Sequence, residues 1–167
     1  IIFEIVLGLE YLFSYNYIHL DIKPENIIIK KEKPIRIKII DLAFCKKLNN
    51  SDNKLDAIYG TIGYCSPEVI LQKRYSHNSD IWSLGIILYI LFKDHYLFGN
   101  TKKTYINDLK NFENIKKFRK IYLEGIDKEA LELINNMLVK DPTDRYSLRD
   151  VKNHEFIQTN KESNINK

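Results

Sequence analysis

The sequence contains only two cysteines, Cys45 and Cys65, in 167 residues. Neither belongs to a C-x-x-C pair, and none of the four histidines stands at ligand spacing from them, which argues against a zinc site. Two cysteines in a chain of this length also do not form a disulfide framework. We therefore expect an intracellular, cytoplasmic location.

Long apolar runs and a strong excess of one charge are also lacking. The longest near-continuous apolar segment, residues 81–92, is interrupted by Ser83 and Gly85 and is shorter than the roughly 20 residues that cross a bilayer. We expect a buried helix there and no membrane insertion. The 26 basic and 22 acidic residues give a net charge of +4 without a single basic stripe, so nucleic acid is not an expected partner.

What the sequence does have is a succession of helical apolar patterns around two short β-branched segments. This arrangement predicts a mainly α domain with a small β-hairpin, an α+β fold class. One domain is expected over residues 1–157, followed by a polar, disordered tail over 158–167. We expect helices over residues 1–14, 81–92 and 127–138, the second of them opened by Ser79-Asp80, and further helices that start after Ser66 and after Ser147. Strands are expected over residues 26–29 and 35–40. Residues 41–61 should form a long loop that is functional or mobile.

The segment His19–Asn26 carries the polar residues that are hardest to explain as part of a core. Asp21 can accept a proton from a hydroxyl group, and Lys23 can neutralise charge on a phosphoryl group. Asn26 offers an amide oxygen suited to Mg²⁺, and Asp41 delivers a second oxygen ligand at the end of an apolar strand. A base, a cation and two oxygen donors are what phosphoryl transfer requires of a protein.

This segment resembles the catalytic loop of protein kinases, H-R-D-x-K-x-x-N, and Asp41-Leu42-Ala43 resembles the D-F-G that follows it. Residues 60–68 resemble the family's G-T-x-x-Y-x-A-P-E, residues 80–85 its D-x-W-S-x-G, and residues 138–145 its L-x-x-D-P-x-x-R. The motifs occur in the family's order over nearly the whole chain. The chain is therefore identified as the C-terminal lobe of a eukaryotic-type protein kinase, of the serine/threonine branch and most similar to calmodulin- and calcium-dependent kinases.

The resemblance implies a role for each residue of the catalytic group. Asp21 is the catalytic base, and Lys23 contacts the γ-phosphate of ATP. Asn26 and Asp41 hold Mg²⁺, with Mn²⁺ as the alternative ion. Thr61 hydrogen-bonds near Asp21 and Lys23, and together with Lys23 it indicates the serine/threonine branch.

The resemblance also implies scaffold residues around this group. Asp80 caps backbone N–H groups of the catalytic loop, and His19 is structural. Glu68 and Arg145 form a buried, bidentate ion pair.

Substrate contacts are implied at the edge of the same loop. Glu25 occupies a position that binds arginine of the substrate in basophilic kinases, and Ile90 stands where some of those kinases carry a second acid. We therefore expect a modest preference for a basic residue before the target serine or threonine. An apolar residue just after the target is expected near Ile62 and Cys65.

Three positions depart from the family pattern. Leu20 replaces an arginine that grips a phosphate on the activation loop, so phosphorylation of that loop, for example at Ser51, is not expected to act through this contact. Leu42 and Ala43 replace Phe and Gly, and the Cβ of Ala43 makes a left-handed backbone costly by ~1–2 kcal/mol. These departures support an alternative, a pseudokinase or truncated kinase lobe that acts as a protein-binding scaffold.

The family's G-x-G-x-x-G loop and V-A-I-K lysine do not occur in the sequence. In the family they belong to the N-terminal lobe, and ATP binds between the two lobes. We therefore expect an N-terminal lobe as the partner of these residues in the full-length chain, protein substrates for the whole enzyme, and no activity from this fragment alone.

Overall fold

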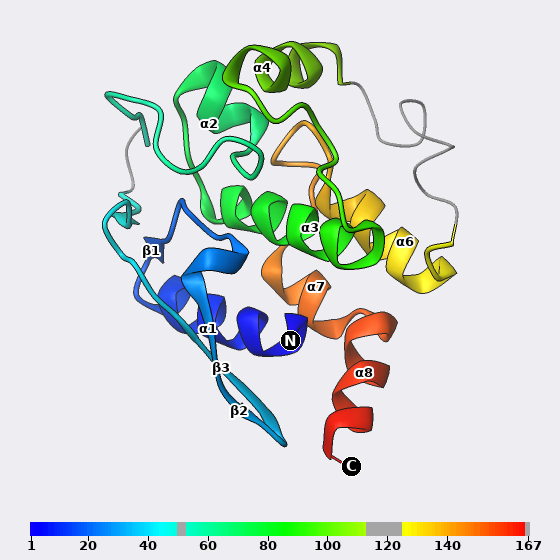
Figure 1. The fold of residues 1–167 in the computed structure, drawn as a ribbon. Coiled ribbons are helices and arrows are strands. Elements are labelled where there is room, and N and C mark those ends of the chain that lie inside the picture. Colours follow the sequence, from blue (N-terminus) through cyan, green and yellow to red (C-terminus); the bar gives the residue numbers. More distant parts are fainter. Residues whose placement is uncertain (50–52, 113–124, 166–167) are drawn as a thin grey trace.

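The computed structural model describes residues 1–49, 53–112 and 125–165 (Figure 1). The fold is mainly helical with two small antiparallel sheets, which confirms the predicted class. Within these residues no helix is both long and apolar enough to cross a bilayer. The elements are α1 (Ile2–Ser14), β1 (Tyr17–Ile18), the 3₁₀ turn η1 (Pro24–Asn26), β2 (Ile27–Glu32), β3 (Ile35–Ile39), β4 (Lys46–Lys47), α2 (Pro67–Gln72), α3 (His77–Lys93), α4 (Lys102–Asn111), α6 (Lys128–Met137), α7 (Leu148–Asn153) and α8 (Glu155–Ile165).

Helix α3 lies at the centre of the molecule, with α2 and α4 on one side and α1 and α7 on the other (Figure 1). All its residues from Ser79 to Tyr89 are buried, because apolar side chains occur on every side of this helix. Gly85 lets α6 pack closely, since a Cβ at this position would lie 2.9 Å from Cδ2 of Leu138. The buried helix predicted from the apolar run is therefore the core of the fold.

Helix α3 begins at His77, before the predicted start at Ser79-Asp80. Ser76 is the N-cap residue, and its hydroxyl accepts a hydrogen bond from the N–H of Asn78. The hydroxyl of Ser79 in turn accepts from the N–H of Ser76, which completes a capping box. The prediction was wrong because the first turn is polar and gives no apolar signal.

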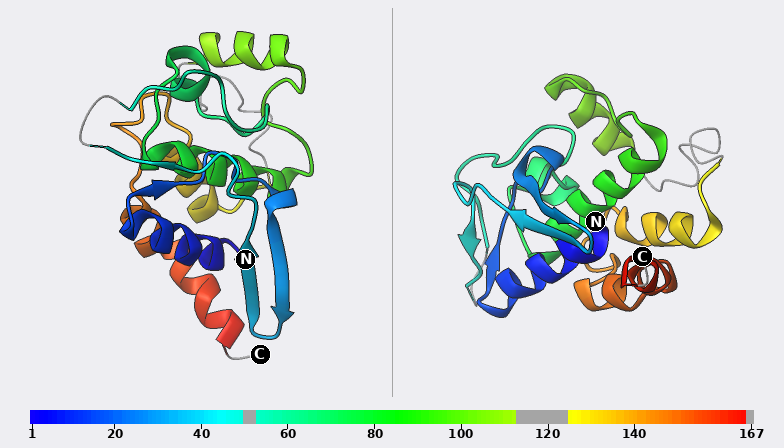
Figure 2. Two further views of the ribbon diagram at one scale, coloured as in Figure 1. Left: turned by 90° about the vertical axis from the view of Figure 1, so that its left-hand side faces the viewer. Right: turned by 60° about the horizontal axis from the view of Figure 1, so that its bottom comes forward.

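Strands β2 and β3 form the predicted hairpin, with Ile27 opposite Ile39. The hairpin extends beside α1 (Figure 2), and β3 packs against this helix. Gly8 of α1 makes room for it, because a Cβ at this position would lie 2.7 Å from Cδ1 of Ile39. The register of the hairpin brings the end of β3 next to η1, which matters for the site described below.

The segment 41–61, expected to be a loop, is attached to the body of the fold at two places. Strand β4 pairs with β1, with Lys47 opposite Tyr17. Further along, the N–H of Leu55 donates to the carbonyl of Lys73 at 2.7 Å. Two-residue strands have no periodicity, so the sequence did not predict β4. Ser51, the example given above of a loop position at which phosphorylation is not expected to act through Leu20, lies outside the described residues.

The C-terminal part of the described chain packs beneath α3. Helix α6 presents Leu133 and Ile134 to the core, both fully buried. Helix α7 begins with the predicted capping box of Ser147 and Asp150. Helix α8 continues to Ile165 and so extends into the segment that we expected to be a disordered tail. The domain limits themselves stay a prediction.

Candidate active site

The catalytic loop is fixed by the N-terminal part of α3. Asp80 is fully buried, and its carboxylate accepts the N–H of His19 at 2.8 Å and the N–H of Leu20 at 2.9 Å. Burial raises the pKa of Asp80 to about 7, while these two donors act in the opposite direction. Asp80 thus caps the backbone N–H groups of the two residues that precede Asp21, as the resemblance implied.

Asp21 is the centre of a hydrogen-bonded group of four side chains. Its carboxylate accepts the hydroxyl of Thr61 at 2.7 Å and lies 3.1 Å from the ammonium of Lys23. Lys23 also donates to the Thr61 oxygen at 2.7 Å. The amide nitrogen of Asn26 donates to the Asp21 carboxylate at 3.1 Å and to its backbone carbonyl at 2.9 Å. The sequence-predicted base, cation and amide therefore meet at one point.

Asn26 and Asp41 are brought together by the hairpin. The N–H of Ile40 donates to the carbonyl of Asn26 at 2.9 Å, so Asp41 follows directly at the end of β3. Because the amide nitrogen of Asn26 is used by Asp21, its amide oxygen is the atom left for a metal. The Asp41 carboxylate is exposed. One carboxylate and one amide oxygen fit Mg²⁺, which commonly takes one or two protein ligands together with phosphate oxygens and water.

The left-handed residue at the end of β3 is Asp41, with φ 65°, and not Ala43. The N–H of Ala43 donates to the Asp41 carboxylate at 3.2 Å. The cost that a left-handed backbone would carry at Ala43 therefore does not arise here, because an aspartate, which tolerates this backbone better than most residues, takes the left-handed position.

His19 connects the catalytic loop to the strand that carries Asp41. The N–H of Asp21 donates to Nδ1 of His19 at 3.2 Å, so this nitrogen is an acceptor. The proton of the neutral ring then sits on Nε2, which donates to the carbonyl of Ile40 at 3.1 Å. Burial lowers the pKa of His19 and favours this neutral form.

Thr61 reaches Asp21 because a glycine precedes it. Gly60 has φ +92°, and a Cβ at this position would lie 2.3 Å from the carbonyl oxygen of Leu20. No other residue type permits this approach of the two loops. The G-T pair of the motif thus has a physical reason.

Of the two residues expected to contact an apolar substrate residue, only Ile62 lies near the surface. Cys65 is 4% exposed, and its Sγ lies 3.1 Å from the carbonyl of Thr61. Burial raises the pKa of the Cys65 thiol to about 12. The Cys65 side chain packs under the loop, so of these two residues Ile62 is the one whose side chain is accessible here, and a substrate contact of either stays a prediction. Glu25 is exposed.

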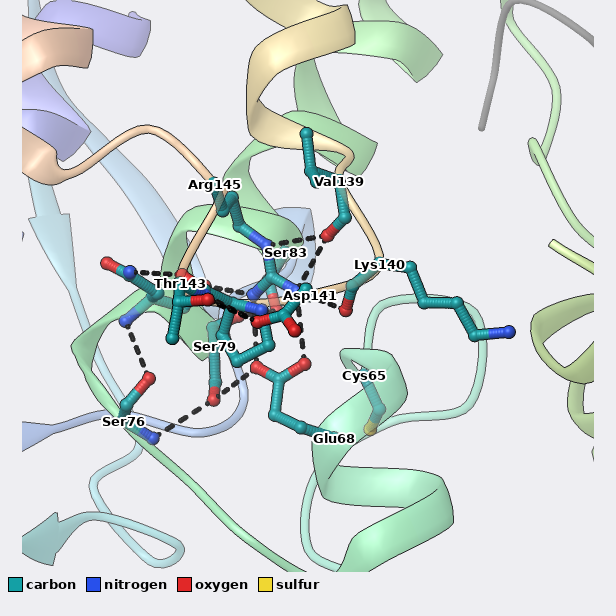
Figure 3. Close-up of polar contacts among 12 residues, drawn as sticks. Cys65, Glu68, Ser76, Ser79, Ser83, Val139, Lys140, Asp141, Thr143 and Arg145 are labelled. Atoms are coloured by element: carbon teal, nitrogen blue, oxygen red, sulfur yellow. Dashed lines mark hydrogen bonds and ion pairs between the residues drawn. The ribbon is translucent and has the colours of Figure 1, made fainter. Parts of the chain in front are cut away.

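Glu68 and Arg145 form the implied ion pair (Figure 3). Two parallel hydrogen bonds of 3.0 Å join them, and both side chains are at most 4% exposed. Ser79, which we had read only as a helix start, donates to Glu68 at 2.8 Å. Arg145 also donates to the carbonyls of Val139 at 2.9 Å and Asn78 at 2.5 Å. The pair thus ties α2, α3 and the turn before α7 together.

Leu20 lies in an apolar cluster rather than at a phosphate site. It is 5% exposed and packs with Leu55 of the segment 41–61. The other buried members of the cluster are Ile18, Val69 and Tyr75. The segment is therefore held to the catalytic loop by apolar contacts at the position where the family has an arginine.

The arrangement brings together the base, the cation and the two oxygen donors that the sequence analysis singled out. A family model described as "Protein kinase domain" matches residues 1–157. The chain belongs to the protein kinase domain family, as its motifs predicted.

Known relatives are protein kinases of more than one kind. An Aurora kinase of Dictyostelium discoideum is 37% identical over 155 residues, which cover 93% of this chain and 38% of that protein. An Aurora kinase of Eremothecium gossypii is 33% identical over 160 residues, 96% of this chain and 41% of that protein. Calcium-dependent protein kinase 6 of Plasmodium berghei is 35% identical over 159 residues, 95% of this chain and 10% of that protein. The chain spans about two fifths of the Aurora kinases, and these matches fit that group as well as the predicted calcium-dependent one.

Proposed function

We propose that this chain is the C-terminal lobe of a serine/threonine protein kinase, which transfers the γ-phosphate of ATP to hydroxyl groups of protein substrates. The proposal is carried by the contact of Asp21, Lys23 and Thr61, in which the threonine hydroxyl joins the carboxylate and the ammonium at 2.7 Å each. A carboxylate and a cation held this way suit a reaction in which a hydroxyl attacks a phosphoryl group.

In the proposed reaction Asp21 orients the substrate hydroxyl and takes up its proton as the new bond to the γ-phosphorus forms, while the bond from that phosphorus to the bridging oxygen breaks and ADP leaves. Lys23, whose side chain is 20% exposed, neutralises negative charge on the transferred group from its position beside Asp21. Thr61 keeps both side chains in place. Mg²⁺–ATP, when bound, supplies the phosphoryl group and screens its charge, and Asn26 and Asp41 would hold the metal.

The remaining part of the nucleotide site would come from an N-terminal lobe, and we propose that this lobe is required for activity. The β2–β3 hairpin has exposed apolar side chains, Ile28 at 39% and Ile29 at 51%, and the loop after β3 adds Leu42 at 56%. Such a surface fits contact with a further part of the same protein.

The test uses the full-length protein that contains this chain, incubated with ATP, Mg²⁺ and a set of serine and threonine peptides. We expect phosphate incorporation, and Asp21→Asn should lower kcat by about 10²–10⁴-fold, the usual contribution of a positioned base. Asp127→Asn changes an exposed carboxylate away from the site and should have no effect. If the wild-type protein transfers no phosphate with either Mg²⁺ or Mn²⁺, the scaffold alternative takes the place of this proposal.

A further inference from the structure

A tyrosine that the motifs do not include stands directly before Gly60 and Thr61. Tyr59 is half-buried and packs against the apolar cluster that contains Leu20. Its backbone carbonyl accepts a hydrogen bond from Sγ of Cys65 at 3.3 Å, which fixes the chain where it enters the Thr61 loop. Tyr59 is therefore firmly attached to the loop that contacts the catalytic base.

The ring of Tyr59 contacts side chains that follow Asp41 in the sequence. Phe44 meets this ring edge-on, with centroids 5.7 Å apart and an interplanar angle of 72°. The ammonium of Lys46 lies 4.4 Å from the centroid of the same ring, which is a cation–π distance. Lys46 also pairs with Ile18 between β4 and β1, so its backbone is held to the strand that precedes the catalytic loop. One ring thus joins the chain after Asp41 to the Thr61 loop.

The hydroxyl of Tyr59 fixes the direction of the ring. It donates to the carboxylate of Asp56 at 2.7 Å. The backbone carbonyl of Asp56 in turn accepts a hydrogen bond from Nζ of Lys73, the C-cap residue of α2, at 3.0 Å. The turn before Tyr59 is therefore joined to α2, and the ring does not need to be ordered before it contacts its partners.

We propose that Tyr59 is a positioning residue for phosphoryl transfer, whose ring couples the chain after Asp41 to the loop of Thr61. The inference rests on the proposed kinase function. Phosphoryl transfer depends on the placement of the metal-bound phosphate relative to the base and the attacking hydroxyl. Asp41 belongs to the metal side of this arrangement and Thr61 to the base side. A side-chain contact between the two loops keeps both sides in one geometry.

With this contact Asp41 is restrained on both sides. His19 binds the carbonyl of Ile40 before it, at 3.1 Å, and the ring of Tyr59 holds the chain after it. Without the ring, the torsions of Asp41 are free to turn the carboxylate away from Asn26. We therefore expect the affinity for Mg²⁺ and kcat to fall together, while KM for the peptide substrate stays unchanged.

The experiment measures kcat, KM for a peptide substrate and the Mg²⁺ concentration at half-maximal rate, with the full-length protein. Tyr59→Leu keeps an apolar side chain and removes the ring. We expect kcat to fall and the half-maximal Mg²⁺ concentration to rise, each by about 3- to 30-fold, the range that a cation–π contact supports. Tyr59→Phe keeps the ring contacts and should stay close to wild type. Lys46→Met removes only the cation and should cause a smaller change in the same direction.

The matched control is Tyr11→Leu. Tyr11 is an exposed tyrosine of α1 that also has an edge-on partner, Tyr15, with centroids 5.2 Å apart. It lies outside the catalytic group, so its substitution should leave kcat and the Mg²⁺ dependence unchanged.

A second measurement follows the loop without catalysis. Limited proteolysis with thermolysin, without nucleotide or metal, should cut the segment 41–61 faster in Tyr59→Leu than in the wild type or in Tyr59→Phe. Urea unfolding of the same variants should change little, because the loss is local to the contact between the two loops.

The outcomes distinguish this inference from the proposed function. No phosphorylation of any peptide by the wild-type protein contradicts the kinase function itself. An unchanged Mg²⁺ dependence or an unchanged cleavage rate in Tyr59→Leu overturns the role of Tyr59 while the kinase function stands. A Tyr59→Phe variant as impaired as Tyr59→Leu also overturns it, because the effect then comes from the hydroxyl. If Tyr59→Leu does not fold, Lys46→Met decides, and a wild-type Mg²⁺ dependence in that variant contradicts the proposal.

Discussion

The buried ion pair of Glu68 and Arg145 gives the sharpest prediction about stability. In the substitution Glu68→Gln the side chain keeps its shape but loses its charge. The guanidinium then retains neutral partners only, among them the carbonyls of Val139, Asn78 and Lys140. Since both side chains are at most 4% exposed, water cannot replace the lost carboxylate. Breaking a pair of this kind by removing one partner lowers the free energy of unfolding by about 3–5 kcal/mol.

The sequence provides its own reporter for this experiment. Trp82 is the single tryptophan, it is fully buried, and its ring lies 5.2 Å from Cζ of Arg145. Urea unfolding followed by Trp82 fluorescence therefore measures the decrease in the free energy of unfolding with a probe that lies next to the ion pair. The matched control is Glu10→Gln, because the pair of Glu10 and Lys152 is 50% and 32% exposed and should contribute at most about 1 kcal/mol.

A double-mutant cycle tests the physical reason. Arg145→Met alone leaves a buried carboxylate with Ser79 as its remaining donor and should also be strongly destabilising. Combining it with Glu68→Leu removes both charges, so the double variant should be more stable than the sum of the two changes predicts. A loss below about 1 kcal/mol for Glu68→Gln, or simple additivity in the cycle, would refute the assignment of this pair as a desolvated, mutually dependent unit.

Three further predictions concern the loops and the pH dependence of folding. Leu55→Ala should lower the free energy of unfolding by about 2–5 kcal/mol, since it removes a buried partner of Leu20. Limited proteolysis should then cut the segment 41–61 faster, and an unchanged cleavage rate would contradict the anchoring of this segment by Leu55. Gly60→Ala should lower kcat by displacing the Thr61 loop, and an unchanged kcat would mean that the loops tolerate a Cβ facing the Leu20 carbonyl. Burial lowers the pKa of His77 below its ordinary 6.5, so the native state binds fewer protons and stability falls as the pH drops below 6.5. His77→Phe should reduce this loss between pH 7.5 and pH 5.5 in urea unfolding, and an identical slope would show that other groups cause it.

Much of the fold follows from local sequence. The helix over residues 1–14, the hairpin and the capping box at Ser147 were predicted because periodicity and capping are properties of neighbouring residues. The two-residue strand β4 was missed because it depends on contacts with a distant part of the chain, and the first turn of α3 was missed because it is polar and gives no apolar signal. The signal for α3 was present in Ser76, whose spacing to Ser79 is that of a capping box.

The site shows the same division between local and distant information. The residues around Asp21 stand in one short segment and were found by chemistry and resemblance. The burial of Cys65 and the apolar surroundings of Leu20 depend on how separate loops pack, which no local pattern contains.

The imidazole of His19 has a consequence for how the site can move. One ring nitrogen holds the amide of Asp21 and the other holds the carbonyl of Ile40, so a single rigid ring sets the spacing between the base and the strand that delivers Asp41. The two cannot move apart without breaking at least one of these hydrogen bonds. As long as both bonds hold, a rearrangement that carries the Asp41 carboxylate away must come from rotation about the torsions of Asp41 itself, while β3 keeps its position.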